Sequence, residues 1–309
     1  SGKLTDTWPV NFDDNPSSAG FANEDKNNAQ ELYNDDIFVG YRYYDTFGVD
    51  VSYPFGYGGS YTSFAMSTKS VKADKDKVTV QVKVKNTGTV SGKEVAEVYF
   101  SAPEGNLDKP YQELAGYAKT DELAPGESQV LTITYDTTEM GSYDTDKAAY
   151  VMEDGDYIIR VGNSSRNTHV AAKLNVAEDT ITEQYSNLMV PVTENDNIEN
   201  SDKYPTLEPM TTEGATSITY DGEANEIAAA KTIEVDFTGY KAPEIIKENE
   251  DVTVYTSDTT EEKYLFAKNE DGATGTVSRV EKGNANSTDY SVTYQEHVKK
   301  FDGDYSKNT

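Results

Sequence analysis

The 309-residue sequence contains no cysteine. This absence excludes disulfide bonds, cysteine-ligated zinc, iron–sulfur clusters and a cysteine nucleophile among these residues. The sequence also lacks any apolar run of about 18 residues, so it predicts no transmembrane helix. The opening residues SGKLTDTWP have neither the basic start nor the apolar stretch of a signal peptide.

Basic residues are scarce beside acidic ones. There are 27 lysines and arginines against 55 aspartates and glutamates, which gives a formal net charge of −28. A field of this sign repels phosphate, so nucleic acid and anionic membranes are not expected partners. Together with glycosylation sequons at Asn163 and Asn286, the acidity favours an extracellular or cell-surface location, with the cytoplasm as the alternative.

Residues that commonly carry catalysis or bind cofactors are also few. The two histidines, His169 and His297, lie far apart in polar stretches and are expected to be surface groups. The sequence holds no nucleophile elbow, Walker A loop or dinucleotide-binding glycine pattern. Acidic clusters such as Glu248, Glu250 and Asp251 lack calcium-loop spacing, so neither a cofactor nor a metal is expected.

The clearest folded unit is predicted over residues 65–176. Apolar residues alternate from Lys77 to Val84, which is a strong strand pattern, and further strand segments read EVAEVYFSAP, VLTITYD and YIIRV. Turns are expected at Asn86-Thr87-Gly88, at Pro125-Gly126 and at Asp154-Gly155, the last as a hairpin. Short strands at this spacing predict a mainly β fold built as a sandwich.

The flanking segments are less regular. Residues 1–64 show a brief alternation around Trp8, a VGYRYYD strand, a PFGYG loop and an SYTSF strand, too few elements to close a core of their own. Residues 177–309 are acidic and partly aperiodic, and they predict a connector. Within it, TIEVDFTGY and DVTVYTSD are expected strands, EKYLFAKNEDG is a strand or a short helix, and the stretch from SRVEKG onward holds one or two more strands.

Two sets of sequence segments together resemble glycoside hydrolase family 3, the β-glucosidase family. One is the stretch IFVGYRYYDTFGVDVSYPFGYGGSYTSF, and the other is the ordered series KNTG, EVYF, KPYQELAGYAKT, LAPGES and DGDYIIRVGNSS. The family loop usually carries leucine where Gly59 stands, so an apolar anchor is missing here. The positions of the first stretch that carry the resemblance are Gly40, Tyr41, Arg42, Tyr43, Asp45, Pro54, Phe55, Gly56, Gly58, Ser60 and Tyr61.

The resemblance implies three regions. Residues 1–64 would be the C-terminal part of an α/β sandwich domain, incomplete in this chain. Residues 65–176 would be a fibronectin type III-like, immunoglobulin-like β-sandwich. Residues 177–309 would be an irregular, β-rich connector leading to a barrel, as in permuted members of the family.

Retaining glycosidases act through two carboxylates about 5–5.5 Å apart. The resemblance places the nucleophile in the barrel, commonly in a Ser-Asp-Trp context, whereas the single tryptophan here, Trp8, follows Thr7. The acid/base glutamate of the family lies upstream of the matching segment. We therefore expect no catalytic residue here, but an accessory portion that supports hydrolysis of terminal β-linked glucose by domains in the same chain or in an associated one.

Four residues are candidates for contact with the sugar: Arg42, Tyr53, Phe55 and Tyr57. In the competing interpretation, Arg42 pairs with an acid such as Asp45 and the aromatic residues pack at a domain junction. Two functions of other classes stay open. One is an extracellular structural or adhesive module that self-associates by strand addition, and the other is a carbohydrate-binding module that uses the tyrosine-rich loop.

Two further acids, Glu94 and Glu97, flank the EVYF strand. They are read either as hydrogen-bond partners of a sugar or as the solvent-facing side of an alternating strand.

Overall fold

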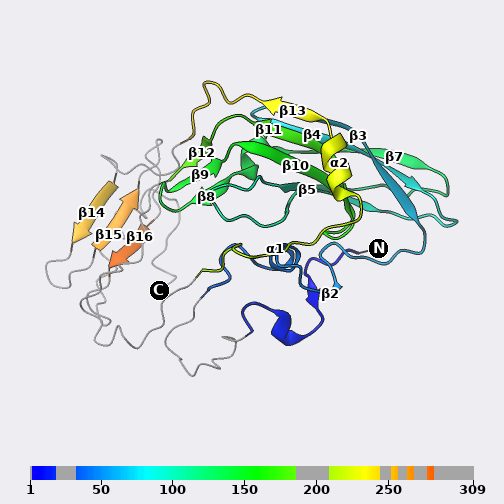
Figure 1. The fold of residues 1–309 in the computed structure, drawn as a ribbon, viewed down its shortest axis with the longest axis horizontal. Helices are drawn as coiled ribbons and strands as arrows, with labels where there is room; N and C mark the ends of the chain where they lie inside the picture. The colour runs from blue at the N-terminus through cyan, green and yellow to red at the C-terminus, as the bar shows by residue number, and fades with distance from the viewer. Residues whose placement is uncertain are drawn as a thin grey trace, which may run out of the picture. The chain divides into compact units, whose positions relative to one another are not determined.

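The computed structural model describes residues 2–18, 33–185 and 209–243, together with the backbone of strands at 252–256, 263–267 and 277–281. The described part is mainly β, as predicted (Figure 1). It divides into two compact units, of which the first holds residues 1–143, 151–182 and 200–240. No helix in the described ranges combines the length and apolarity that crossing a membrane requires.

The first sheet of this unit has three antiparallel strands in the order β3-β4-β7: β3 (Phe64–Ala73), β4 (Lys77–Asn86) and β7 (Ser128–Asp136). The predicted alternation on β4 is confirmed, because Val78, Val80, Val82 and Val84 are all fully buried. In the β4–β7 register Val80 faces Ile133 and Val82 faces Leu131, so both strands turn their apolar side to the same face.

The second sheet has five strands in the order β13-β11-β10-β5-β6. They are β5 (Val95–Ser101), β6 (Glu113–Lys119), β10 (Gly155–Gly162), β11 (Thr168–Val176) and β13 (Thr232–Val235). The pairings are antiparallel except for β13, which joins β11 in parallel. The strand predicted in TIEVDFTGY is therefore confirmed, and it is one of the two edge strands of this sheet.

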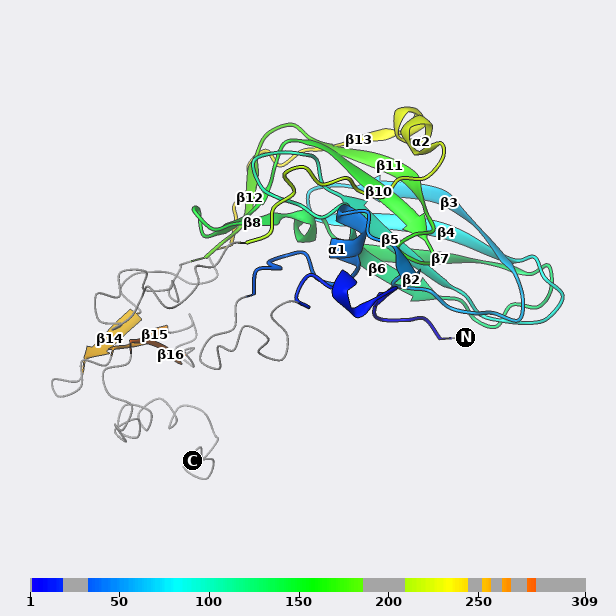
Figure 2. The same ribbon diagram turned by 60° about the horizontal axis from the view of Figure 1, so that its bottom comes forward.

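One hydrophobic core joins the two sheets. Its buried residues include Val80 and Ile133 from the first sheet and Val98, Ile159 and Leu174 from the second. The two sheets therefore form a two-layer β-sandwich, which Figures 1 and 2 show from two sides.

Shorter elements precede the sandwich or lie between its strands. Four of them come before β3: strand β1 (Trp8–Pro9), which pairs antiparallel with β2 (Val51–Tyr53), and the helices η1 (Phe12–Asp14) and α1 (Tyr41–Thr46). Helix η3 (Thr137–Met140) follows β7, and helix α2 (Glu223–Ala229) precedes β13.

The second unit holds residues 144–150, 183–199 and 241–309. Its described strands β14 (Val252–Thr256), β15 (Lys263–Ala267) and β16 (Val277–Glu281) form an antiparallel sheet in that order. The expected strands at DVTVYTSD and in the stretch from SRVEKG are thereby confirmed, and EKYLFAKNEDG forms a strand rather than a helix. Three further strands, whose residues fall in both units, pair in the order β12-β9-β8: β8 (Ser142–Asp144), β9 (Ala149–Met152) and β12 (Thr180–Gln184).

Three local predictions were wrong. The VGYRYYD tract is not a strand but contains α1, and SYTSF contributes only its last residue, Phe64, to β3. Asp154-Gly155 does not close a hairpin, because it connects β9 and β10, which belong to different sheets. The predicted domain limits at residues 64 and 176 stay a prediction.

Candidate functional site

The tract from Gly40 to Tyr61 packs against the loops and strands of the sandwich. We call this contact region the junction, and α1 is the first element of the tract. Gly40 has φ +59°, a left-handed conformation that favours glycine, and its carbonyl accepts hydrogen bonds from the backbone amides of Tyr43 and Tyr44. Six residues are too few for a helix that is stable alone, so its contacts with the sandwich stabilise it. The strand propensity of tyrosine is overridden here because Tyr44, Asp45 and Thr46 are buried on the helix.

Asp45 is the buried centre of the junction. Its carboxylate lies 2.9 Å from Nε of Arg166, and Gln112 Nε2 donates to its other oxygen at 3.3 Å. Arg166 also donates to the backbone carbonyl of Val49 at 2.6 Å. Burial raises the pKa of Asp45, while the bond from Arg166 opposes that rise. This ion pair therefore fastens α1 to the loop between β10 and β11.

Arg42 does not pair with Asp45, as one interpretation of the sequence expected. Its Nη1 lies 3.2 Å from Glu113 Oε2 at the start of β6. Burial raises the pKa of Glu113, and the guanidinium of Arg42 opposes that rise. The general expectation of an arginine–carboxylate pair is confirmed with a different acid.

Tyr41 joins the same strand through its hydroxyl, which accepts the backbone N–H of Leu114 at 2.8 Å. Burial raises the pKa of Tyr41 to about 12. The Tyr41 ring lies 4.9 Å from the ring of Phe55 and 6.0 Å from that of Tyr99 on β5. Phe55 therefore packs at the junction, as the competing interpretation predicted.

The PFGYG loop turns at Gly56. The Tyr57 amide donates to the Pro54 carbonyl at 3.1 Å, and Gly56 has φ +79°, the geometry of a type II turn. A Cβ on Gly56 would lie 2.5 Å from Glu97 Oε2. Glycine is required here both by the backbone conformation and by the close approach of the Glu97 carboxylate.

Glu94 and Glu97 are both buried, so the solvent-facing interpretation was wrong. Glu97 accepts a hydrogen bond of 2.6 Å from the Tyr99 hydroxyl, and its pKa is raised by burial. Glu94 lies 3.0 Å from Lys3 Nζ, an ion pair that holds the start of the chain to β5. The physical reason is that the segment before the sandwich covers this end of β5 and replaces solvent.

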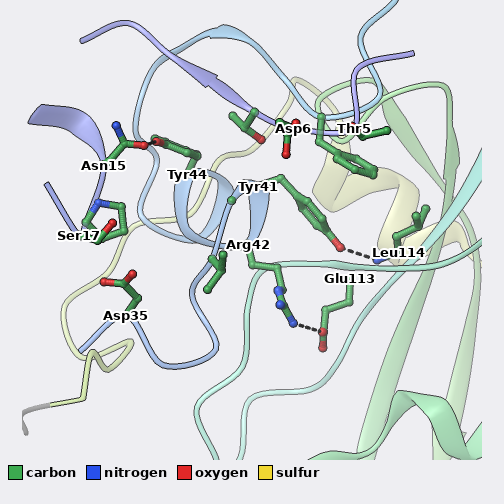
Figure 3. Close-up of a pocket in the computed structure, with 15 residues that line it drawn as sticks. Thr5, Asp6, Asn15, Ser17, Asp35, Tyr41, Arg42, Tyr44, Glu113 and Leu114 are labelled. Carbon is green, nitrogen blue, oxygen red and sulfur yellow. Dashed lines mark hydrogen bonds and ion pairs between the residues drawn. The ribbon is translucent and has the colours of Figure 1, made fainter. Parts of the chain in front are cut away.

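A cleft of about 560 Å³ opens beside α1 (Figure 3). The Arg42–Glu113 ion pair and the Tyr41–Leu114 hydrogen bond lie on one side of it, with Asp6 and Asp35 also at its lining. These groups offer donors and acceptors to a polar ligand. The described residues contain no cluster of three or more His, Asp or Glu side chains able to hold a metal.

The other two candidates, Tyr53 and Tyr57, lie on the surface beside Trp8. We name these three residues, Trp8, Tyr53 and Tyr57, the aromatic patch. Their exposed fractions are 54%, 41% and 45%. The Tyr53 ring lies 6.0 Å from Trp8 and 4.8 Å from Tyr57, and the patch borders a concavity of about 400 Å³. The four candidates are thus divided, with Arg42 and Phe55 at the junction and Tyr53 and Tyr57 on the surface.

Other positions of the resembling tract have local roles. Tyr43 stacks on Phe47 at 5.2 Å, and the Ser60 hydroxyl accepts the amide of Thr62. Tyr61 is fully exposed. A Cβ on Gly58 would meet the carbonyl of Gly2 at 2.4 Å, whereas Gly59 has open space around it.

Of the remaining sequence candidates, the structure describes only His169 and Asn163. His169 is confirmed as a surface group, with 66% of its side chain exposed and Glu226 at 3.1 Å. Asn163 lies at the loop after β10, where its amide donates to Glu94. The remaining candidates, His297, Asn286, Glu248, Glu250 and Asp251, lie outside the described residues.

Sequence reasoning missed the sandwich residues that hold the junction: Arg166, Gln112 and Glu113. Arg166 and Asp45 are 121 residues apart, and no local pattern in the sequence links them. A weak signal was available for Gln112 and Glu113 alone, because both lie in KPYQELAGYAKT, one of the segments that carry the family resemblance.

Comparison with known proteins matches residues 94–165 to the fibronectin type III-like domain family. Beta-glucosidase A of Butyrivibrio fibrisolvens is 40% identical over 214 residues, which cover 62% of this chain and 25% of that protein. The Ruminococcus albus beta-glucosidase is 42% identical over 198 residues, covering 62% and 20%. The chain thus spans about a quarter or less of the length of these relatives.

Solved structures agree. A beta-glucosidase from Paenibacillus barengoltzii superposes with a TM-score of 0.57 at 45% identity, covering 60% of this chain and 21% of that one. The GH3 beta-glucosidase of Bifidobacterium adolescentis gives a TM-score of 0.51 at 32% identity, covering 62% and 27%. These matches confirm the resemblance to the β-glucosidases of glycoside hydrolase family 3, and residues 94–165 are the part that matches the fibronectin type III-like domain family.

Proposed function

We propose that this chain is a non-catalytic accessory portion of a β-glucosidase-like hydrolase. It supports the hydrolysis of terminal β-linked glucose by catalytic domains that lie in the same polypeptide or in an associated chain. In this role the sandwich is a rigid base, and the junction tract holds the preceding segment against it. An extracellular or cell-surface setting is part of the proposal, supported by the acidity and the sequons.

The proposal rests mainly on one observation: exposed large hydrophobic side chains are concentrated in the segment before the sandwich. Of the exposed large hydrophobic residues in the described ranges, eight lie between residues 8 and 61: Trp8, Val10, Phe12, Tyr33, Val39, Tyr53, Tyr57 and Tyr61. The sandwich strands, in contrast, bury most of their apolar residues in one core. Exposed aromatic residues gathered on one segment are typical of a surface that another domain covers.

The buried carboxylates support a structural role. Asp45 is held by Arg166, Glu94 by Lys3, Glu97 by the Tyr99 hydroxyl and Glu153 by Lys109. A retaining glycosidase needs one carboxylate free to attack and another free to transfer a proton. Acids bound to neighbouring side chains within the fold are poorly placed for either task.

Complementation tests the proposal. The region matching this chain is deleted from a β-glucosidase relative, and this chain is supplied as a separate polypeptide. We expect aryl-β-glucoside hydrolysis to be absent with either part alone and restored by mixing. The double variant Trp8→Ser, Tyr53→Ser should restore less activity, while Tyr117→Ser, an exposed tyrosine on β6, should restore it fully. Equal restoration by all variants, or none with the unmodified chain, contradicts the proposal.

A second candidate is carbohydrate binding by the aromatic patch, which the exposure of Tyr53 and Tyr57 favours. Trp8 is the only tryptophan of the chain, so its fluorescence reports on this patch alone. Saturable quenching by soluble β-glucans that Tyr53→Ser abolishes would support this function, and unchanged fluorescence would contradict it. Strand addition at the edge strands β6 and β13 stays a prediction.

A further inference from the structure

A second cavity shares no lining residue with the cleft described above, and Thr46 at the end of α1 belongs to its lining. It has a volume of about 500 Å³ and is lined by the loop of residues 102–110 and by residues from 212 to 217. Ser101 and Arg160, from the neighbouring strands β5 and β10, and Tyr111 also line it. We propose that this cavity binds a neutral polyhydroxylated ligand, of the size of a sugar unit or a small polyol, outside any catalytic centre.

Arg160 supplies the recognition group. Its side chain is only 3% exposed, and Nη2 forms an ion pair of 2.6 Å with Glu223 on α2. Nε donates to the Ser101 hydroxyl at 2.8 Å, and the guanidinium lies 4.7 Å above the Tyr111 ring. Nη1 is buried and has no hydrogen-bond partner. A buried charged donor left without an acceptor is unfavourable, so an acceptor brought by a ligand stabilises this arrangement.

The walls of the cavity are fixed in place before any ligand binds. Asp108 Oδ1 accepts the backbone amide of Thr212 at 3.0 Å, which joins the loop to the later segment. Glu153 anchors the loop of residues 102–110, because it accepts a hydrogen bond from the amide of Asn106 at 2.7 Å and forms an ion pair with Lys109. A site whose walls are already positioned loses less entropy when it binds a ligand.

The charges at the cavity favour a neutral ligand. The cations Arg160 and Lys109 are each paired with a carboxylate, whereas the acids Glu104 and Asp108 also belong to the lining. An anion would be repelled by these acids and by the negative charge of the whole chain. A hydroxyl group can accept from Arg160 and donate to Asp108 or Ser101, and the volume lies within the usual range for small-ligand sites.

The inference goes beyond the proposed function. It concerns ligand binding by the isolated chain and requires no catalytic partner. Failure of the ligand to bind would leave the complementation experiment unaffected, and failed complementation would leave the cavity unaffected.

Titration of the full chain with glucose and with glycerol, followed by isothermal calorimetry and ligand-observed NMR, tests the site. The blocking variant Ala215→Phe fills the cavity, and its matched control Thr216→Phe places the same ring on a neighbouring exposed residue that does not line it. We expect saturable binding of at least one of the two probes, weakened about tenfold or more by Ala215→Phe and unchanged by Thr216→Phe. Acetate should not bind.

Two further variants test the site independently of Ala215→Phe. Thermal melting of every variant shows whether it is still folded. Ser217→Leu blocks the same cavity from another position, and Arg160→Lys keeps a charge for Glu223 but removes Nη1. Both should weaken binding. The proposal is overturned if neither glucose nor glycerol binds saturably, if blocking and control variants bind alike, or if acetate binds in preference to both. A crystal soaked with glucose that shows only water at Nη1 would also overturn it.

Discussion

Arg166 Nε lies 2.9 Å from the Asp45 carboxylate, although the two residues are 121 positions apart in the chain. Asp45 is fully buried on α1, and Arg166 follows β10 in the sandwich. The pair therefore couples the tract before the sandwich to the sandwich itself.

Removing this carboxylate should destabilise the fold. Asp45→Ala removes the carboxylate that accepts from Arg166 Nε and Gln112 Nε2. Because 23% of the Arg166 side chain is exposed, we expect a loss of about 2–3 kcal/mol in unfolding free energy. Chemical denaturation measures it. The exposed pair Lys75–Asp76 provides the control, and Asp76→Ala should cost less than about 1 kcal/mol. Similar effects of the two variants would show that the junction pair is not structural.

Gly56 and Gly59 make a matched test of the PFGYG turn. Gly56→Ala places a methyl group against Glu97 and Ser164 at a positive φ, so we expect a loss of about 2 kcal/mol or more in unfolding free energy. Gly59→Ala meets nothing within 4 Å and should be neutral or stabilising by up to about 1 kcal/mol. Thermal melts of the two variants distinguish them, and an undisturbed Gly56→Ala protein would refute the close approach of Glu97.

The carboxyl of Glu97 should make stability depend on pH. Because burial raises its pKa in the folded chain, the stability that it contributes is present below its ordinary pKa and is lost as pH rises through the folded value. Glu97→Gln keeps the shape and an acceptor for the Tyr99 hydroxyl but does not titrate. The unfolding free energy of the variant, relative to the unmodified chain, should therefore be higher at about pH 7 than at about pH 4. Urea denaturation at both values measures this difference, and a pH-independent difference would contradict it.

The aromatic patch should mediate association of the isolated chain. With Trp8, Tyr53 and Tyr57 exposed, we expect the sedimentation coefficient to rise with concentration. Replacing all three by serine should abolish that rise, while Tyr117→Ser, which removes a side chain exposed to 70%, should leave it in place. A monomer at every concentration, or association that survives the triple variant, would show that the patch is inert.

The sandwich was predictable because its strands carry their pattern locally. Val78 to Val84 alternate without interruption, and the structure buries all four valines of that run. β3 was missed because few of its residues are buried, which leaves little alternation to detect. α2 lies between an acidic segment and an edge strand, and its seven residues give a helical period little length to show.

The junction was predictable in kind but not in its pairings. A tract dense in tyrosine and glycine indicated packing against another domain, and Phe55 does pack at the junction, against the Tyr41 ring. Its helix could not be predicted, since contacts with β5 and β6 override the strand propensity of tyrosine. The partners of Arg42 and Asp45 depend on which distant loops the fold brings close, and that information is absent from either neighbourhood in the sequence.

Hydrolysis of an aryl β-glucoside by the purified 309-residue chain alone is the most direct test of the central claim. If the chain is an accessory portion, turnover should equal the buffer blank, while the same preparation restores activity to a relative that lacks the matching region. Turnover by the isolated chain that disappears when one of its own carboxylates is replaced by an amide would contradict the claim.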